Sequence, residues 1–173
     1  MLESERLLLR QYTWEDLPVL HALLSNPVTM QFWPAPFTLE QSRQWIQRSL
    51  EQYPTGFGRF ALIHKHTNAL IGDAGLLLLE VDGRKENDLG YIIDCEYWEG
   101  GYGTEAAGAV MQYGLDRLGL KRICANMPVD HVGSRKVAER LGMKLEKQFL
   151  NKRNRDIPTC LYAARVKEAS LNE

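Results

Sequence analysis

Hydrophobic and polar residues alternate with two different periods along this chain. In the first third, apolar residues recur at helical spacing, and Thr13 precedes acidic residues that open a helix expected to reach about Ser25. Asn26-Pro27 ends that helix. A second helix is expected from Thr38, where Gln41 completes a capping box, and it would place on one side Trp45, Ile46, Ser49, Leu50 and Tyr53.

The remaining chain is dominated by strand patterns, with two further helices between them. A helix follows the glycine-rich turn 99–104 and stops at Gly119, and a shorter one over residues 134–141 stops at Gly142. The charged segment 81–87 is expected to be a loop, and two glycines mark bulges, Gly72 and Gly75. Strands are expected over residues 6–11, 59–64, 69–80, 88–94, 122–127, 144–150 and 159–165.

This order of elements predicts the fold class. Strands and helices alternate only in the second half of the chain, which indicates an α/β (α+β) protein with a mixed, mostly antiparallel sheet of six to seven strands. Helices would cover both faces of the sheet. No repeat or linker interrupts the sequence, so a single domain over residues 1–173 is expected.

Composition narrows the function classes. The 173 residues include 21 Lys plus Arg and 22 Asp plus Glu, a formal charge of −1, and no basic cluster that would favour nucleic acid as a partner. The apolar runs are too short for a bilayer, and the N-terminal residues lack the layout of a signal peptide, so a cytoplasmic protein without membrane contact is expected. No metal site is expected, because no Cys-x-x-Cys spacing joins Cys95, Cys124 and Cys160.

The turn Glu99-Gly100-Gly101-Tyr102-Gly103-Thr104 carries the strongest chemical signal. It joins a strand to the first turn of a helix, where free main-chain N–H groups bind a diphosphate well. The glycines could also simply form a tight loop. A nicotinamide site is disfavoured because the next strand, over residues 122–126, ends without an acidic residue, and the chain has no P-loop sequence.

Segments spread over most of the chain resemble the GCN5-related N-acetyltransferases, the GNAT family. Leu89-Gly90-Tyr91-Ile92-Ile93 followed by residues 97–106 is similar to the acetyl-CoA signature of that family. The opening residues 5–10 and the late segment 134–143 are similar to the branch that contains the ribosomal-protein alanine N-acetyltransferases. Two positions depart from the family pattern: Trp98 replaces Gln or Arg, and His131 replaces Asn.

The resemblance implies a sheet with a splayed central strand pair and the transfer of an acetyl group from acetyl-CoA. The acceptor would be a primary amine, either a protein N-terminus or a small molecule, attacking directly in a ternary complex of a monomer or homodimer. The alternative is a non-catalytic acyl-CoA-binding regulatory module, which would keep the glycine turn but lack a working base.

Candidate site residues follow from the resemblance and from the chemistry of acyl transfer. A main-chain N–H near Ile93 would stabilise the oxyanion, and Ser134 would be the acid for the leaving thiolate, unless it only caps its helix. Asp88, at a strand end, is the first candidate for general base, with Glu80 and Asp94 behind it. Trp33 and Phe37 would border the acceptor site or belong to the core. The residues expected to bind the cofactor are Ile93, Asp94, Cys95, Glu99, Gly100, Gly101, Tyr102, Gly103, Thr104, His131, Ser134 and Arg135.

Overall fold

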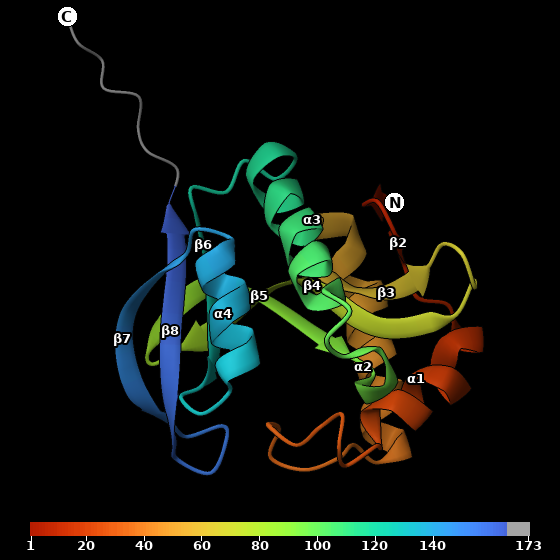
Figure 1. Ribbon diagram of the computed structural model, residues 1–173, viewed down its shortest axis with the longest axis horizontal. Helices are drawn as coiled ribbons and strands as arrows, with labels where there is room; N and C mark the ends of the chain where they lie inside the picture. The colour runs from red at the N-terminus through yellow and green to blue at the C-terminus, as the bar shows by residue number, and fades with distance from the viewer. Residues whose placement is uncertain (166–173) are drawn as a thin grey trace, which may run out of the picture.

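The computed structural model describes residues 1–165, which form one eight-stranded sheet flanked by helices (Figure 1). The strands are β1 (Leu2–Glu3), β2 (Leu7–Arg10), β3 (Gly58–His64), β4 (Leu70–Val81), β5 (Arg84–Ile93), β6 (Arg122–Pro128), β7 (Lys144–Asn151) and β8 (Ile157–Arg165). The helices are α1 (Leu17–Leu24), α2 (Leu39–Gln52), α3 (Tyr102–Asp116) and α4 (Val132–Arg140), with short 3-10 turns η1 (Trp14–Asp16), η2 (Tyr53–Thr55) and η3 (Cys95–Tyr97).

The strand order is β1-β2-β3-β4-β5-β6-β8-β7, and all neighbours are antiparallel except β5 and β6. That parallel pair meets at a single position, Asp88 opposite Cys124, and the strands part beyond it. The expected mixed, mostly antiparallel sheet with a splayed central pair is therefore confirmed. All seven expected strands are present, and β1 is an additional two-residue edge strand.

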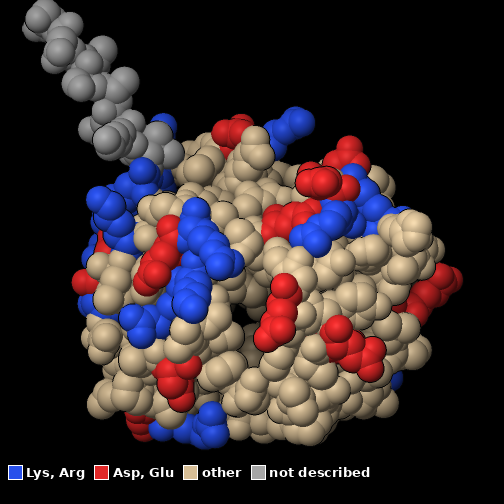
Figure 2. All heavy atoms as spheres, viewed as in Figure 1, with Lys and Arg blue, Asp and Glu red and all other residues tan. Residues whose placement is uncertain are grey.

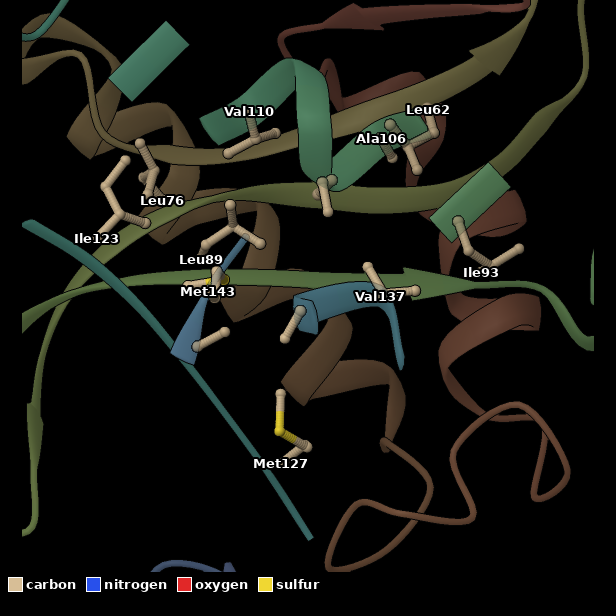
Figure 3. Packing of buried hydrophobic residues seen from close by; sticks show 14 of the residues in the cluster. Leu62, Leu76, Leu89, Ile93, Ala106, Val110, Ile123, Met127, Val137 and Met143 are labelled. Atoms are coloured by element: carbon tan, nitrogen blue, oxygen red, sulfur yellow. The ribbon is translucent and has the colours of Figure 1, made fainter. Parts of the chain in front are cut away.

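Alternation along the strands separates the core into two layers. One face of the sheet packs against α3 and α4, where Leu62, Leu76 and Leu89 meet Ala106 and Val110 (Figure 3). The other face packs against α1 and α2, through Ala61, Ile63 and Ile92. Odd-numbered residues near the end of β5 thus face α3, and even-numbered ones face α2.

The expectation of a loop over residues 81–87 is wrong. Asp82 and Gly83 have φ angles of 48° and 79° and form a two-residue hairpin turn, so β5 begins at Arg84. The charges of this segment suit a strand because Glu86 is buried in an ion pair with Arg122 (2.8 Å). Asp88 consequently lies in the middle of a strand rather than at its end.

The two glycines of β4 have different roles. An extra residue, Ile71, interrupts the register beside Gly72, which confirms a bulge there. Gly75 marks no bulge: a Cβ at this position would lie 2.0 Å from the carbonyl oxygen of Gly58, so only glycine allows the two backbones to approach. In the described residues, no helix has the length and apolar character needed to cross a membrane.

Candidate functional site

A cavity of about 1300 Å³ follows the gap between β5 and β6. Its walls come from the start of α3, from α4, from the segment between α1 and α2, and from the loop between β7 and β8. Figure 2 shows an opening near the centre of one face, with Lys and Arg side chains gathered on the α4 side. The splayed strand pair therefore produces a passage between the two faces of the sheet.

Main-chain groups at the end of β5 are turned into this gap. The Asp94 N–H donates to the carbonyl of Ile71 (2.9 Å). The main-chain N–H and C=O groups of even-numbered residues here therefore point to β4, and those of the odd-numbered Tyr91 and Ile93 point into the gap. The indole N–H of Trp98 donates to the Ile93 carbonyl (2.8 Å). The N–H of Ile93 thus points toward the cavity, as a donor for an oxyanion must.

The glycine-rich turn leads into α3 in the expected way. Gly101, with a φ of 80°, is the N-cap of α3, and the first residues of the helix, whose main-chain N–H groups have no partner within it, line the cavity. Residues of the turn that line the cavity are Glu99, Gly101, Tyr102, Gly103 and Thr104. Gly100 does not line it and lies instead beside the Tyr102 ring.

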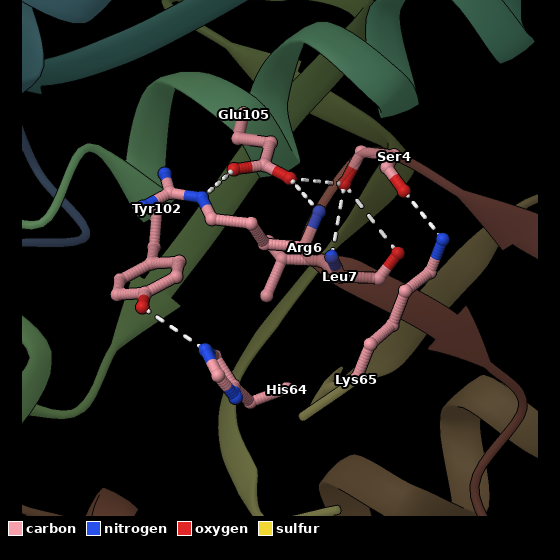
Figure 4. Close-up of polar contacts among 7 residues, drawn as sticks. All are labelled: Ser4, Arg6, Leu7, His64, Lys65, Tyr102 and Glu105. Atoms are coloured by element: carbon pink, nitrogen blue, oxygen red, sulfur yellow. Dashed lines mark hydrogen bonds and ion pairs between the residues drawn. The ribbon is translucent and has the colours of Figure 1, made fainter. Parts of the chain in front are cut away.

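The start of α3 is bonded to the segment between β1 and β2 by a polar cluster (Figure 4). The Glu105 carboxylate accepts hydrogen bonds from the Ser4 hydroxyl (2.7 Å) and from the main chain (2.6 Å) and guanidinium (2.7 Å) of Arg6. Burial alone would raise the pKa of Glu105, but these bonds outweigh it and leave the pKa below its ordinary value. Arg6 also lies 4.3 Å from the Tyr102 ring, whose hydroxyl is 3.1 Å from Nε2 of His64. The turn is therefore held rigidly against the sheet.

The start of α4 faces α3 across the cavity. His131 is the N-cap, and its Nδ1 accepts from the Ser134 N–H (3.3 Å) while its ring stacks on Phe32 (3.8 Å between centroids). Burial lowers the pKa of His131 to about 4, so the ring is neutral, as an accepting Nδ1 requires. Ser134 is therefore not the cap. Its hydroxyl accepts from the Tyr91 hydroxyl (3.5 Å) beside the cavity.

Asp88 lines the cavity at the point where β5 and β6 part. Its carboxylate accepts a hydrogen bond from the Asn126 amide on β6 (2.7 Å), and burial raises the pKa of Asp88 to about 7. Glu80 also lines the cavity but is exposed. Asp94 does not line it, because its side chain accepts from the Glu96 N–H (3.1 Å) as the cap of η3. Among the three candidate bases, Asp88 alone combines burial with access to the cavity.

Aromatic residues form the wall on the α2 side. Trp33 lines the cavity, as expected, together with Trp45 of α2. Phe37 does not line it; its ring packs behind them, 5.5 Å from Trp45 and 5.7 Å from Trp33. The loop between β7 and β8 closes this side, where the Asn154 amide donates to the Phe32 carbonyl (2.9 Å).

Two further expected residues lie away from the cavity. Arg135 donates to the carbonyl of Val129 (3.1 Å) and to the Tyr162 hydroxyl (3.3 Å), which directs it toward β8. Cys95 lies past the end of β5, where its N–H donates to the Thr29 hydroxyl (3.1 Å). The cysteines at 95, 124 and 160 are free, and residues 1–165 contain no group of three His, Cys, Asp or Glu that could hold a metal.

The sequence did not predict that three side chains would line the cavity. They are those of Asn126, Arg59 and Tyr91. Asn126 is a polar residue near the end of an apolar strand, which is a signal for a site. Arg59 and Asp73 are opposite charges in the otherwise apolar strands of one expected hairpin, and this pattern indicates a buried pair.

Comparisons with known proteins agree with this geometry. The model of an acetyltransferase (GNAT) domain matches residues 6–144. The uncharacterized N-acetyltransferase p20 of Bacillus licheniformis is 34% identical over 149 residues, covering 84% of this chain and 83% of that protein. A GNAT-family acetyltransferase from Bacillus anthracis has a TM-score of 0.82 and 26% identity, over 96% of this chain and 99% of that one. RimL, a ribosomal L7/L12 alpha-N-protein acetyltransferase solved in complex with coenzyme A, shares the fold with a TM-score of 0.79 and 23% identity, over 94% of this chain and 96% of that one.

Proposed function

The chain belongs to the GNAT family of acetyltransferases, and we propose that it moves the acetyl group of acetyl-CoA directly to a primary amine held in the same cavity. The observation that carries this proposal is the buried Asp88 carboxylate in the wall of a cavity that also receives the free main-chain groups of β5. A base, an oxyanion donor and a binding site for a diphosphate thus share one passage.

The residues present fit coenzyme A. The free N–H groups at the start of α3 suit its diphosphate, and the main-chain groups of Tyr91 and Ile93 suit its pantetheine amides. Arg140 lines the cavity from α4, with exposed Lys136 one turn before it, so these two rather than Arg135 are placed for phosphate oxygens. When bound, acetyl-CoA supplies an acyl group already activated as a thioester.

The chain's own groups would divide the remaining work. Asp88, with its pKa near neutrality, removes a proton from the acceptor ammonium and leaves a nucleophilic amine. The Ile93 N–H stabilises negative charge on the carbonyl oxygen, and Trp98 holds that strand end in place through the Ile93 carbonyl. Ser134 and Tyr91, whose hydroxyls are hydrogen-bonded, would donate a proton or hydrogen bond to the leaving sulfur.

A protein N-terminus is the leading acceptor class, with small amines as the alternative. The resemblance to ribosomal-protein N-acetyltransferases and the fold shared with RimL support this choice. A cytoplasmic setting, in which thiols stay reduced, suits the free cysteines.

The test is release of the free CoA thiol by purified protein given acetyl-CoA and a mixture of peptides and small amines. We expect acceptor-dependent release with wild type and a loss of about 100-fold in Asp88→Asn, the size typical of a missing general base. Arg43→Met on the far side of α2 is the control and should match wild type. Tight CoA binding without release for any acceptor would favour the non-catalytic binding module instead.

A further inference from the structure

Arg59 is a buried guanidinium in the wall of the cavity. Its side chain is 5% exposed and forms an ion pair with Asp73, which is fully buried. Arg59 Nε donates to Asp73 Oδ1 (2.5 Å), and Asp73 Oδ2 accepts from the Tyr12 hydroxyl (2.5 Å) and the Trp45 indole N–H (2.9 Å). Asp73 is thus fully engaged and holds Arg59 in one orientation.

The outer nitrogens of Arg59 are not used in this way. Within residues 1–165, neither Nη1 nor Nη2 makes a hydrogen bond; Nη2 touches Asp73 without the alignment needed to donate. A guanidinium carries five N–H donors, and a buried donor without a hydrogen bond, such as those of Nη2, is costly, while Nη1 keeps its donors free for a partner. Because Arg59 lines the cavity, these donors indicate a group that is absent from the protein itself.

The guanidinium lies close to the candidate general base. A Cβ at Gly90 would be 2.2 Å from Arg59 Nη1, so glycine at this position is what lets the guanidinium lie across β5. Gly90 follows Asp88 by two residues on the same face of the strand, a separation of about 7 Å. Asp88 and Arg59 have different partners, Asn126 and Asp73, and both face the cavity.

The other charged residues that line the cavity include both signs. Arg48 of α2 and Arg153 of the β7–β8 loop line the same cavity. The acidic lining residues besides Asp88 are Glu80 and Asp82, on the β4–β5 hairpin, and Glu99 and Asp130, beside α3 and α4. The rings of Trp33 and Trp45 complete the wall next to Arg59.

We infer that the acceptor carries a carboxylate close to its amine, with the carboxylate paired to Nη1 of Arg59, the terminal nitrogen that does not contact Asp73, while the amine faces Asp88. This inference rests on the proposed transfer to an amine and specifies the acceptor's chemistry. A guanidinium N–H suits a carboxylate because the hydrogen bond between them is assisted by their opposite charges. Such a group could belong to a free α-amino acid or to a peptide with Asp or Glu near its N-terminus.

The first experiment compares matched acceptors by the rate of CoA thiol release. One arm pairs free amino acids with their carboxamides, and the other pairs peptides that have Asp or Glu at the second position with the same peptides carrying Asn or Gln. We expect kcat/KM to favour the carboxylate by at least tenfold in one arm, which also identifies the source. Equal rates within both arms would overturn the inference while leaving the proposed transfer intact.

Two variants link the preference to Arg59. Arg59→Lys keeps the charge but loses Nη1, and Gly90→Ala adds a methyl group where Nη1 lies; each should reduce the preference for carboxylate over amide at least fivefold. Gly90→Ala leaves both Arg59 and Asp73 unsubstituted, so it provides the test if Arg59→Lys does not fold. Arg43→Met, on the same helix as Arg48 but away from the cavity, should keep the wild-type preference. If Gly90→Ala and Arg59→Lys both keep the wild-type preference, Arg59 serves only to neutralise Asp73 and the inference is wrong.

A binding measurement separates this inference from the proposed function. With CoA present, an N-acetyl amino acid should raise the Tm of wild type more than its N-acetyl amide does, and the difference should disappear in Gly90→Ala. This readout needs no turnover, so it still decides the matter if no acceptor reacts. Equal shifts for acid and amide in wild type would refute the carboxylate site.

Discussion

The Asn126 side-chain amide donates a 2.7 Å hydrogen bond to Asp88 across the line where β5 and β6 part. Each residue belongs to a different strand, yet the two side chains meet on the face of the sheet that carries α2. The bond fixes Oδ1 of Asp88 and leaves Oδ2 without a hydrogen bond from residues 1–165, so one oxygen of the carboxylate is available to an amine in the cavity.

The first prediction concerns the pH dependence of transfer. Because burial raises the pKa of Asp88 to about 7 and a base must be deprotonated, kcat/KM should rise with pH through about 7 and then level off. In Asp88→Asn the rate should fall by about 100-fold and this step should disappear. The measurement is a pH–rate profile on both proteins. Loss of the step in Glu80→Gln, with Asp88→Asn unaffected, would make Glu80 the base.

The same carboxylate predicts how stability changes with pH. Asp88 has a pKa of about 7 when folded against 3.8 ordinarily, so the native state binds more protons between these values and the free energy of unfolding falls as pH rises from about 4 to about 7. Asp88→Asn does not lose this free energy. The difference in free energy of unfolding between Asp88→Asn and wild type should therefore change by about 3–4 kcal/mol in favour of the variant from pH 4 to pH 8. Urea unfolding of both proteins at each pH measures it. A stability difference that does not vary with pH would contradict the prediction.

Gly103 should be needed for cofactor affinity. A Cβ there would lie 3.0 Å from the Tyr91 ring, so Gly103→Val is expected to push that ring into the cavity and weaken CoA binding about tenfold, roughly 1.4 kcal/mol. Calorimetric titration with CoA measures the effect.

Gly108→Ala is the matched control for that substitution, because it lies on the same helix. Its Cβ would make an ordinary contact, 3.5 Å from Leu141. It should leave CoA affinity unchanged and stabilise α3 by up to about 1 kcal/mol. Equal affinity of wild type and a folded Gly103→Val would show that Tyr91 has room to move.

Trp98 should act by holding the end of β5. Trp98→Phe keeps an aromatic ring but removes the N–H that donates to the Ile93 carbonyl, at a cost of about 1 kcal/mol in stability. The kcat should fall several-fold because the Ile93 N–H is less well fixed. Steady-state kinetics and thermal unfolding test this, with Trp14→Phe as the control at an exposed site outside the cavity. A full kcat in Trp98→Phe would mean that the strand end is held by other contacts.

Glu105 should stabilise the start of α3. Glu105→Ala removes three hydrogen bonds to Ser4 and Arg6, but Arg6 is 41% exposed, so we expect a loss of about 1–2 kcal/mol and weaker CoA binding. Glu3→Ala, which breaks the exposed pair with Lys65 (3.1 Å), should cost at most about 0.5 kcal/mol. Since pairing lowers the pKa of Glu105, its contribution should fade as pH falls through that lowered pKa. If Glu105→Ala and Glu3→Ala lose similar stability at neutral pH, the hydrogen bonds of Glu105 stabilise the protein no more than an exposed ion pair does.

Local patterns predicted the elements that depend on neighbouring residues. Thr38 and Gln41 form the expected capping box, with bonds of 3.2 Å and 2.8 Å, and the glycine turn leads into α3. Gly142 ends α4 in a left-handed conformation, with the Met143 N–H bonded to the Ala138 carbonyl (3.0 Å). The Asp82-Gly83 turn was also available from the sequence, because Asp-Gly favours a two-residue hairpin.

The site was less predictable where one residue of register decides the outcome. An α4 that starts at Val132 instead of Ser134 makes His131 the cap, and the side chain of Arg135 then points to β8 rather than to the cavity. Similarly, β5 ends at Ile93, so Asp94 and Cys95 enter a 3-10 turn and leave the gap. The partnership of Asp88 with Asn126 depends on which strands are neighbours, and that is a property of the whole sheet.

Within residues 1–165, strands β1–β5 and strands β6–β8 form two halves of the sheet that are joined by one bridge, between Asp88 and Cys124. Beyond that bridge each half has an open strand edge, and a ligand with amide groups of its own could pair with that edge as a ninth strand. Substrate would then be part of the architecture, and amide hydrogens at Tyr91 and Ile93 should exchange slowly with solvent only while it is bound.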